Sequence, residues 1–82
     1  MERIRIYADF NSCDEQGRVM LNTVGSLRDL EKYKAAIREG AHVVFYMPGE
    51  FEVSGTITFE DIWKGVPDWS TILHENAKQT PK

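Results

Sequence analysis

The clearest pattern in the chain is an alternation of apolar and polar residues near its start. Along residues 3–10, the side chains that would share one face are the apolar residues Ile4, Ile6, Ala8 and Phe10. A period of two is typical of a strand with one buried face, so a strand is predicted there. Residues 11–17 are rich in turn-forming residues, and residues 18–24 predict a second strand. Together these segments predict a hairpin with a long loop.

A helix is predicted after residue 25, where the alternation stops. Ser26 and Asp29 resemble a capping box at its start, and Gly40 favours an end before that position. The helix extends either to Arg38 or only to about Tyr33, because a helix of about three turns and a shorter helix followed by a turn fit equally well. Its apolar stripe would consist of Leu27, Leu30, Tyr33 and Ile37.

Three further strands are predicted in the second half of the chain. Residues 41–47 are almost continuously apolar, which is typical of a strand covered on both faces or central in a small barrel. After a Pro-Gly turn, residues 50–60 alternate again, and Gly55 interrupts their inward face, which indicates a bulge or a sharp bend. Residues 62–66 predict a fifth short strand, followed by a helical turn capped by Asp68. The inward residues of the long strand would be Phe51, Val53, Ile57 and Phe59.

Five short strands and one helix predict a mainly β fold. A strongly bent, mostly antiparallel sheet curled into a small barrel suits these elements best. A flat sheet with one helix on it, an α+β fold, is the alternative. We expect one domain over residues 1–74 and a flexible polar tail over residues 75–82, which lack an apolar face.

The composition agrees with a folded domain. Among 82 residues, 41% are apolar and 28% are charged, as in an ordinary globular protein and unlike a disordered chain. Cys13 is the single cysteine, so no internal disulfide can form, and we interpret it as an inert loop cysteine. No segment approaches the roughly 18 apolar residues of a membrane span, and the first residues lack the apolar run of a secretory signal. We therefore expect a cytoplasmic location and no membrane partner.

The net charge of −3 is unevenly distributed. Residues 1–41 carry seven acids and seven bases, whereas residues 42–82 carry six acids and three bases. Proteins that bind the phosphate backbone of nucleic acids usually carry a basic stripe and a high isoelectric point. The charge therefore disfavours broad nucleic-acid binding.

No motif with the spacing of a catalytic or metal site is present. The chain has no Gly-rich phosphate loop and no nucleophile elbow. Cys13, His42 and His74 lack the paired short spacings of structural zinc sites. Glu50 and Glu52 would lie about 7 Å apart on one strand, and we interpret them as part of a solvated acidic face. The sequence thus predicts no catalytic residue, no metal and no cofactor.

Aromatic and basic side chains are the remaining candidates for binding. Trp63 and Trp69 either fill the core or form an interface, because tryptophan is enriched at binding hot spots. Arg3 and Arg5 share a strand face with Tyr7, a combination that can hold a phosphate or stack a base, although pairing with an acidic neighbouring strand explains them as well. The candidate binding residues are Trp63, Trp69, Tyr7, Tyr46, Arg3 and Arg5.

The chain resembles a group of small bacterial proteins of unknown function over most of residues 4–72. The resemblance is carried by residues 7–11, 21–25, 29–30 and 38–40, by Val53 and Gly55, and by Trp63, Asp68 and Trp69. It implies a shared small fold and assigns no functional residue.

A weaker resemblance is to SH3-like barrels of the KOW or Tudor type. It rests on the order of Gly40, Val43, Phe45, Gly49 and Gly55, and it implies an SH3-like barrel. KOW domains carry basic residues around the corresponding hairpin, whereas this chain has Glu50, Glu52 and Glu60 there. This difference disfavours binding to RNA or the ribosome.

These observations predict a non-enzymatic module that binds a protein partner or associates with itself. An RNA- or ribosome-associated barrel is the alternative, and a small ligand-binding protein is the second alternative.

Overall fold

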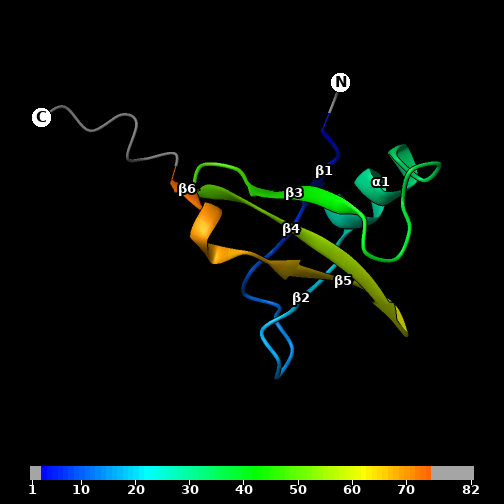
Figure 1. Ribbon diagram of the computed structural model, residues 1–82, viewed down its shortest axis with the longest axis horizontal. Helices are drawn as coiled ribbons and strands as arrows, with labels where there is room; N and C mark the ends of the chain where they lie inside the picture. The colour runs from blue at the N-terminus through cyan, green and yellow to red at the C-terminus, as the bar shows by residue number, and fades with distance from the viewer. Residues whose placement is uncertain (1–2, 75–82) are drawn as a thin grey trace, which may run out of the picture.

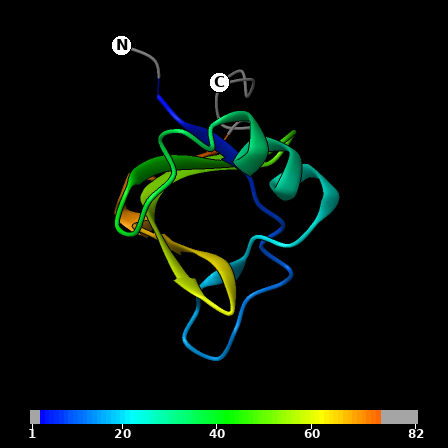
Figure 2. The ribbon, with the colours of Figure 1, turned by 90° about the vertical axis from the view of Figure 1, so that its right-hand side faces the viewer.

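A curled sheet is the main feature of the structure, a computed structural model that describes residues 3–74. The strands follow the order β1 (Arg5–Tyr7), β3 (His42–Met47), β4 (Phe51–Glu60), β5 (Ile62–Pro67) and β2 (Val19–Met20), and β6 (Leu73–His74) also pairs with β4. A helix, α1 (Val24–Lys32), and a 3₁₀ turn, η1 (Trp69–Thr71), complete the fold (Figure 1). The sheet forms a half-barrel around the core (Figure 2). The prediction of a mainly β fold with a strongly bent sheet and one short helix is confirmed. The predicted tail, residues 75–82, lies outside the described residues.

The first two strands do not form the predicted hairpin. β1 pairs in parallel with β3, with Ile6 opposite Phe45, so the sheet is mixed although its other strand pairs are antiparallel. β2 pairs with β5 at the other end of the strand order. A hairpin is confined to residues 12–20, where Cys13 lies opposite Val19. A parallel pair needs a long crossover, and the segment between β1 and β3, which contains β2 and α1, provides it.

Helix α1 begins earlier than the sequence predicted, and this shortens the strand before it. Thr23 is the N-cap, and its hydroxyl oxygen accepts a hydrogen bond from the Ser26 backbone N–H at 3.2 Å. The strand predicted over residues 18–24 is therefore reduced to β2. The helix ends at Lys32, which agrees with the shorter of the two predicted forms. Leu30 is buried as predicted, but Leu27 is 54% exposed because the helix packs through the side that carries Ser26 and Leu30.

Ser26 and Asp29 do not form the predicted capping box. Both are buried, and they cover the edge of β1 that faces away from β3. The Ser26 hydroxyl donates to the Tyr7 carbonyl oxygen at 2.5 Å, and the Tyr7 N–H donates to Asp29 Oδ2 at 2.9 Å. Gly25 permits this close approach, because a Cβ there would lie 2.9 Å from the Tyr7 ring. The helix thus satisfies strand-edge groups that would otherwise lack partners.

The curl of the sheet depends on two glycines that face the Phe45 ring. Phe45 is completely buried, and a Cβ at Gly65 would lie 2.6 Å from two of its ring atoms. A Cβ at Gly55 would lie 2.9 Å from the same ring and would collide with the Val66 carbonyl oxygen. Gly55 also lies where β4 passes from pairing with β3 to pairing with β5, and β4 curves along this stretch (Figure 1). The glycine thus occupies the position at which the sequence indicated a bulge or bend.

The core fills the concave face of this half-barrel. The alternation predicted several of its members correctly, among them Ile6, Val53 and Ile57, which are buried. Phe59 was expected to face inward as well, but it is 55% exposed. Its ring packs against the half-buried Trp63 with 5.2 Å between ring centroids, because β4 extends beyond the buried part of the sheet at this end.

We predict that Gly65→Ala lowers the free energy of unfolding by about 1–3 kcal/mol, as overpacking of a filled core usually does. The loss should be smaller in a Phe45→Leu background, because leucine lacks the ring atoms that the new Cβ would meet. Gly55→Ala is the matched control: its Cβ also meets the Val66 backbone, so Phe45→Leu should relieve it less. Urea unfolding of the single and double variants measures these differences. An equal loss for Gly65→Ala in both backgrounds would contradict the proposed contact.

Candidate functional site

Aromatic side chains from three separate segments meet at one end of the half-barrel. Phe10 follows β1, Phe51 begins β4, and Trp69 begins η1. The ring centroid of Phe10 lies 5.2 Å from those of Phe51 and Trp69, and the last two are 5.9 Å apart. The His74 ring borders Phe51 at 6.0 Å. We call Phe10, Phe51 and Trp69 the aromatic surface.

Short hydrogen bonds fix Trp69 against the sheet. Asp68 caps η1, since its carboxylate accepts from Ser70 N at 3.1 Å and from the Ser70 hydroxyl at 2.6 Å. Two bonds join this turn to β4: Asp68 N donates to the Ser54 carbonyl at 2.8 Å, and Ser54 N donates to the Thr71 hydroxyl at 2.9 Å. The cap predicted at Asp68 is thus present. This short capped turn holds the Trp69 indole against Phe10 and Phe51.

The aromatic surface is only partly covered. Trp69 is 48% exposed, whereas Phe10 and Phe51 are half-buried. The Phe10 ring lies 6.3 Å from that of Phe45, which joins the surface to the core. Such a group of rings offers apolar contact area with little loss of side-chain freedom on binding, since its rings are already ordered by packing.

The two tryptophans predicted as binding candidates are separated. Trp63 lies near the other end of β4, where it packs against the core and against Phe59. Sequence reasoning did not single out Phe10 and Phe51 as surface residues, because the alternation placed them on the inward face. They do lie on that face, but at its open end. Their positions beside the turn segments at residues 11–17 and 48–49 could have indicated this.

The other four candidates lie together on the outer face of β1 and β3. The rings of Tyr7 and Tyr46 are 5.9 Å apart and edge-on, and the Arg5 guanidinium lies 4.9 Å from the Tyr46 ring centroid. Arg5 also forms an ion pair with Glu52 at 3.4 Å. Arg3 donates to the Ser54 hydroxyl at 3.0 Å. The pairing of arginine with an acidic strand neighbour, which the sequence suggested as one explanation, is therefore present for Arg5.

Tyr46 is also tied to the buried carboxylate of α1. Its hydroxyl donates to Asp29 Oδ2 at 2.7 Å, the same oxygen that accepts from Tyr7 N. Burial raises the pKa of the Tyr46 hydroxyl, and the hydrogen bond to Asp29 raises it further. Both tyrosines thus take part in fixing the helix to the sheet.

A groove of about 760 Å³ crosses the sheet next to these residues. Its polar lining includes Arg3, His42, Ser54 and Thr56, with Val66 on its apolar side. His42 and Thr56 are directly opposite one another on β3 and β4. The second alternative, a small ligand-binding protein, would need a concave site, and this groove is where a ligand would bind.

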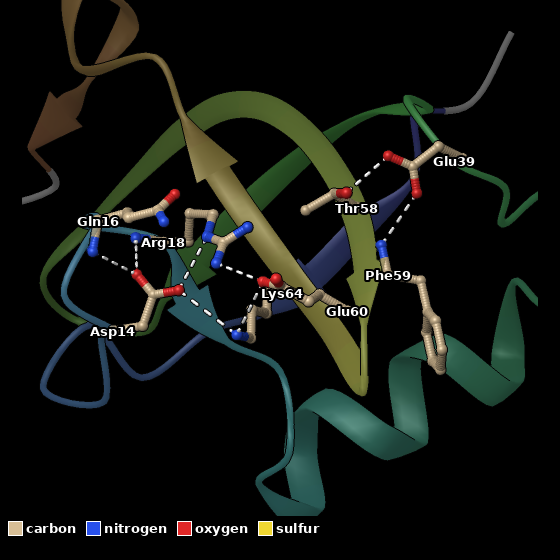
Figure 3. A network of polar contacts seen from close by, with 8 residues as sticks. All are labelled: Asp14, Gln16, Arg18, Glu39, Thr58, Phe59, Glu60 and Lys64. Carbon is tan, nitrogen blue, oxygen red and sulfur yellow. Dashed lines mark hydrogen bonds and ion pairs between the residues drawn. The ribbon is translucent and has the colours of Figure 1, made fainter.

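A second group of charged side chains links the hairpin at residues 12–20 to β4 and β5 (Figure 3). Arg18 contacts Asp14 Oδ2 at 2.8 Å and Glu60 Oε1 at 2.5 Å, and Lys64 lies 3.5 Å from both carboxylates. The Arg18 backbone N–H and side chain lower the pKa of Asp14 to about 2. The Arg18 hydrogen bond likewise lowers the pKa of Glu60. Opposite charges are matched within this network, so it holds the hairpin in place.

Glu39 binds the same end of β4 as this charged network, at residues 58–59 (Figure 3). It accepts from the Thr58 hydroxyl at 2.6 Å and from Phe59 N at 3.0 Å, and the Thr58 bond lowers the pKa of its carboxyl group. The carboxylate thereby occupies the place of a further strand along β4.

Cys13 has the properties of an unreactive thiol. Its side chain lies 3.4 Å from the Phe10 carbonyl oxygen, and burial followed by the charges of Asp14 and Asp9 raises its pKa. A raised pKa reduces the thiolate fraction at neutral pH. Within residues 3–74, no group of three His, Cys, Asp or Glu side chains is arranged to hold a metal ion.

Comparisons with protein-family models, with curated proteins and with solved structures find no match to this chain. The two resemblances noted from the sequence therefore stay predictions. In the described part of the chain, no helix is long and apolar enough to cross a membrane.

We predict that Asp14→Asn lowers stability at pH 7 and flattens its pH dependence. The pKa of Asp14 is about 2 in the folded state, whereas the ordinary value of an aspartate is 3.8, so as the pH falls the unfolded chain binds this proton before the folded protein does. The stabilisation is therefore present above about pH 4 and is lost as the pH falls toward 2. Chemical denaturation of wild type and variant at several pH values tests this. The prediction would be contradicted if the free energies of unfolding of the two proteins fell by the same amount between pH 4 and pH 2.

Proposed function

We propose that this protein is a non-enzymatic module that binds a protein partner through the aromatic surface. The observation that carries the proposal is the half-exposed Trp69, held in place by η1 and packed edge-on against Phe10 and Phe51. Tryptophan is among the residues most enriched at binding hot spots, where it fills a desolvated contact. A cytoplasmic location goes with this proposal, since Cys13 is a free thiol in an exposed position.

Association with RNA is a second candidate, on different residues. It is supported by the presence of Arg3, Arg5, Tyr7 and Tyr46 on one face of the sheet. Against it stand the pairing of Arg5 with Glu52 and the net charge of −3. Binding to single-stranded nucleic acid requires a positive groove beside the stacking rings. We therefore rank the protein-binding proposal first.

We predict that Trp69→Ala abolishes capture of a specific protein from a bacterial lysate, because it removes the largest exposed ring of the aromatic surface. Leu27→Ala is the matched control: Leu27 is 54% exposed but lies on α1. Both variants should unfold at urea concentrations close to that of wild type. The captured protein is then purified and its affinity for all three forms is measured by calorimetry, with a loss of at least ten-fold expected for Trp69→Ala.

Treatment of the lysate with nuclease distinguishes protein binding from RNA binding. Capture that disappears after nuclease treatment and weakens in an Arg3→Ala, Arg5→Ala double variant would favour the RNA candidate. Equal capture by wild type and Trp69→Ala would exclude the aromatic surface as the binding site.

A further inference from the structure

We propose that the groove on the outer face of the sheet binds a free α-amino acid with an apolar side chain. None of the three rings of the aromatic surface lines this groove, so the proposal stands apart from the protein-binding function. It follows from two opposite charges, those of Arg3 and Asp68, which both line the groove and form no ion pair with each other.

The groove crosses neighbouring strands in their order in the sheet. Arg3 lies just before β1, His42 begins β3, residues 54–56 are central in β4, and Val66 lies near the end of β5. Residues 54–56 are Ser, Gly and Thr, whose small side chains leave space between the longer side chains on either side. The volume of about 760 Å³ lies within the range of about 300–1,000 Å³ that is usual for small-molecule sites.

The polar side chains of the groove share one face of the sheet. The Arg3 guanidinium donates to the Ser54 hydroxyl at 3.0 Å, so these two groups meet on the outer face. Thr56 is two residues further along β4 and therefore points to the same side as Ser54. His42 of β3 lies directly opposite Thr56, and opposite residues of paired strands also share a face.

Asp68 lies next to Ser54 on the side away from β3. Pro67 is opposite Gly55 in the register of β4 and β5, so Asp68, the next residue, lies opposite Ser54. The hydrogen bond of 2.8 Å from Asp68 N to the Ser54 carbonyl oxygen agrees with this register. Cβ atoms of opposite residues are about 5 Å apart. Ser54 thus lies between the guanidinium of Arg3 and the side chain of Asp68.

Neither of the two charges is neutralised within residues 3–74. Arg3 and Asp68 take part in no ion pair among these residues. A guanidinium has five N–H groups, and Ser54 accepts from Arg3 through a single nitrogen. Asp68 Oδ1 accepts from Ser70, whereas Oδ2 accepts no hydrogen bond from the described residues. Both groups can therefore bind a ligand.

Two unpaired opposite charges in one groove favour a ligand that carries both. The carboxylate of an α-amino acid would pair with Arg3, and its ammonium group would pair with Asp68. One carbon joins the two charged groups of such a molecule, so with a hydrogen bond at each end it spans up to about 8 Å. This span suits two groups on either side of Ser54. The Ser54 hydroxyl accepts from Arg3 and can donate its own hydrogen to the ligand carboxylate.

The same groups argue against other ligands. Asp68 would repel a purely anionic molecule such as phosphate, and Arg3 would repel a purely cationic one. An apolar molecule would remove water from both charges without replacing it. Val66 is directly opposite Thr56 on the same face and is 39% exposed, so it offers an apolar contact to the side chain of the amino acid.

Three related probes test the need for both charges. Leucine carries both, N-acetyl-leucine lacks the ammonium group, and leucinamide lacks the carboxylate. Each is titrated at pH 7 into the ¹⁵N-labelled protein, up to about 10 mM, which nearly saturates a site with a Kd of about 1 mM. We expect leucine to shift the amide signals of Ser54, Thr56 and Asp68 and to leave that of Leu27 on α1 unchanged. Each derivative should bind about five-fold more weakly, since exposed ion pairs contribute modestly.

Two charge variants assign each ligand group to its partner. Arg3→Gln should bind leucine and leucinamide equally, because the partner of the carboxylate is gone. Asp68→Asn keeps an oxygen for the bond from Ser70 and should bind leucine and N-acetyl-leucine equally. The matched controls are Arg28→Gln and Asp61→Asn, which change the net charge by the same amounts at exposed positions outside the groove and should keep the wild-type preferences. Urea unfolding verifies that all four variants are folded.

Three results would overturn the proposal. The first is the absence of leucine-dependent shifts at Ser54, Thr56 and Asp68. The second is a wild-type protein that binds either derivative as tightly as leucine, since the groove would then recognise a single charge. The third is an Arg3→Gln or Asp68→Asn variant that is folded and keeps the full wild-type preference for leucine over the derivatives.

Discussion

The contact between the Phe45 ring and the backbone at Gly55 and Gly65 determines the shape of this protein. A buried ring needs space beneath it, and both glycines provide that space because they lack a Cβ. With the ring in place, β4 curves past it and pairs first with β3 and then with β5. One long strand can thus serve two parts of the sheet. The half-barrel follows from this arrangement, and with it the positions of Phe51 and η1 at one end.

Side chains complete the sheet where strands are missing. On β1, Ser26 and Asp29 of the helix bond to the edge of Tyr7, and on β4 the Glu39 carboxylate binds the N–H of Phe59. In both places a polar side chain satisfies backbone groups that would otherwise be open to another chain. Asp29 and Glu39 therefore have a structural role, since each accepts a hydrogen bond from a strand edge. A buried or hydrogen-bonded carboxylate would otherwise suggest a catalytic residue.

The aromatic surface is a consequence of an incomplete barrel. A half-barrel covers its inner face well in the middle, where Phe45 and Ile57 are buried, and less well at its ends. Phe10 and Phe51 lie on the inner face at one such end, and η1 adds Trp69 beside them without covering it. The same geometry exposes Phe59 at the other end of β4. Hydrophobic side chains that remain exposed for this reason supply the contact area on which the proposed function depends.

The sequence by itself determined the local elements: the alternation around Ile6 and Ile57, the special position of Gly55 and the cap at Asp68 are all present in the structure. These features depend on neighbours along the chain, which periodicity and turn chemistry describe. Only the tertiary structure decided that β1 pairs in parallel with β3 and that Asp29 serves a distant strand instead of its own helix end. It also decided that Trp63 packs against the core and Phe59, while Trp69 is half-exposed beside Phe10 and Phe51 at the other end of the sheet. Such outcomes depend on which distant segments meet, and no local pattern carries that information.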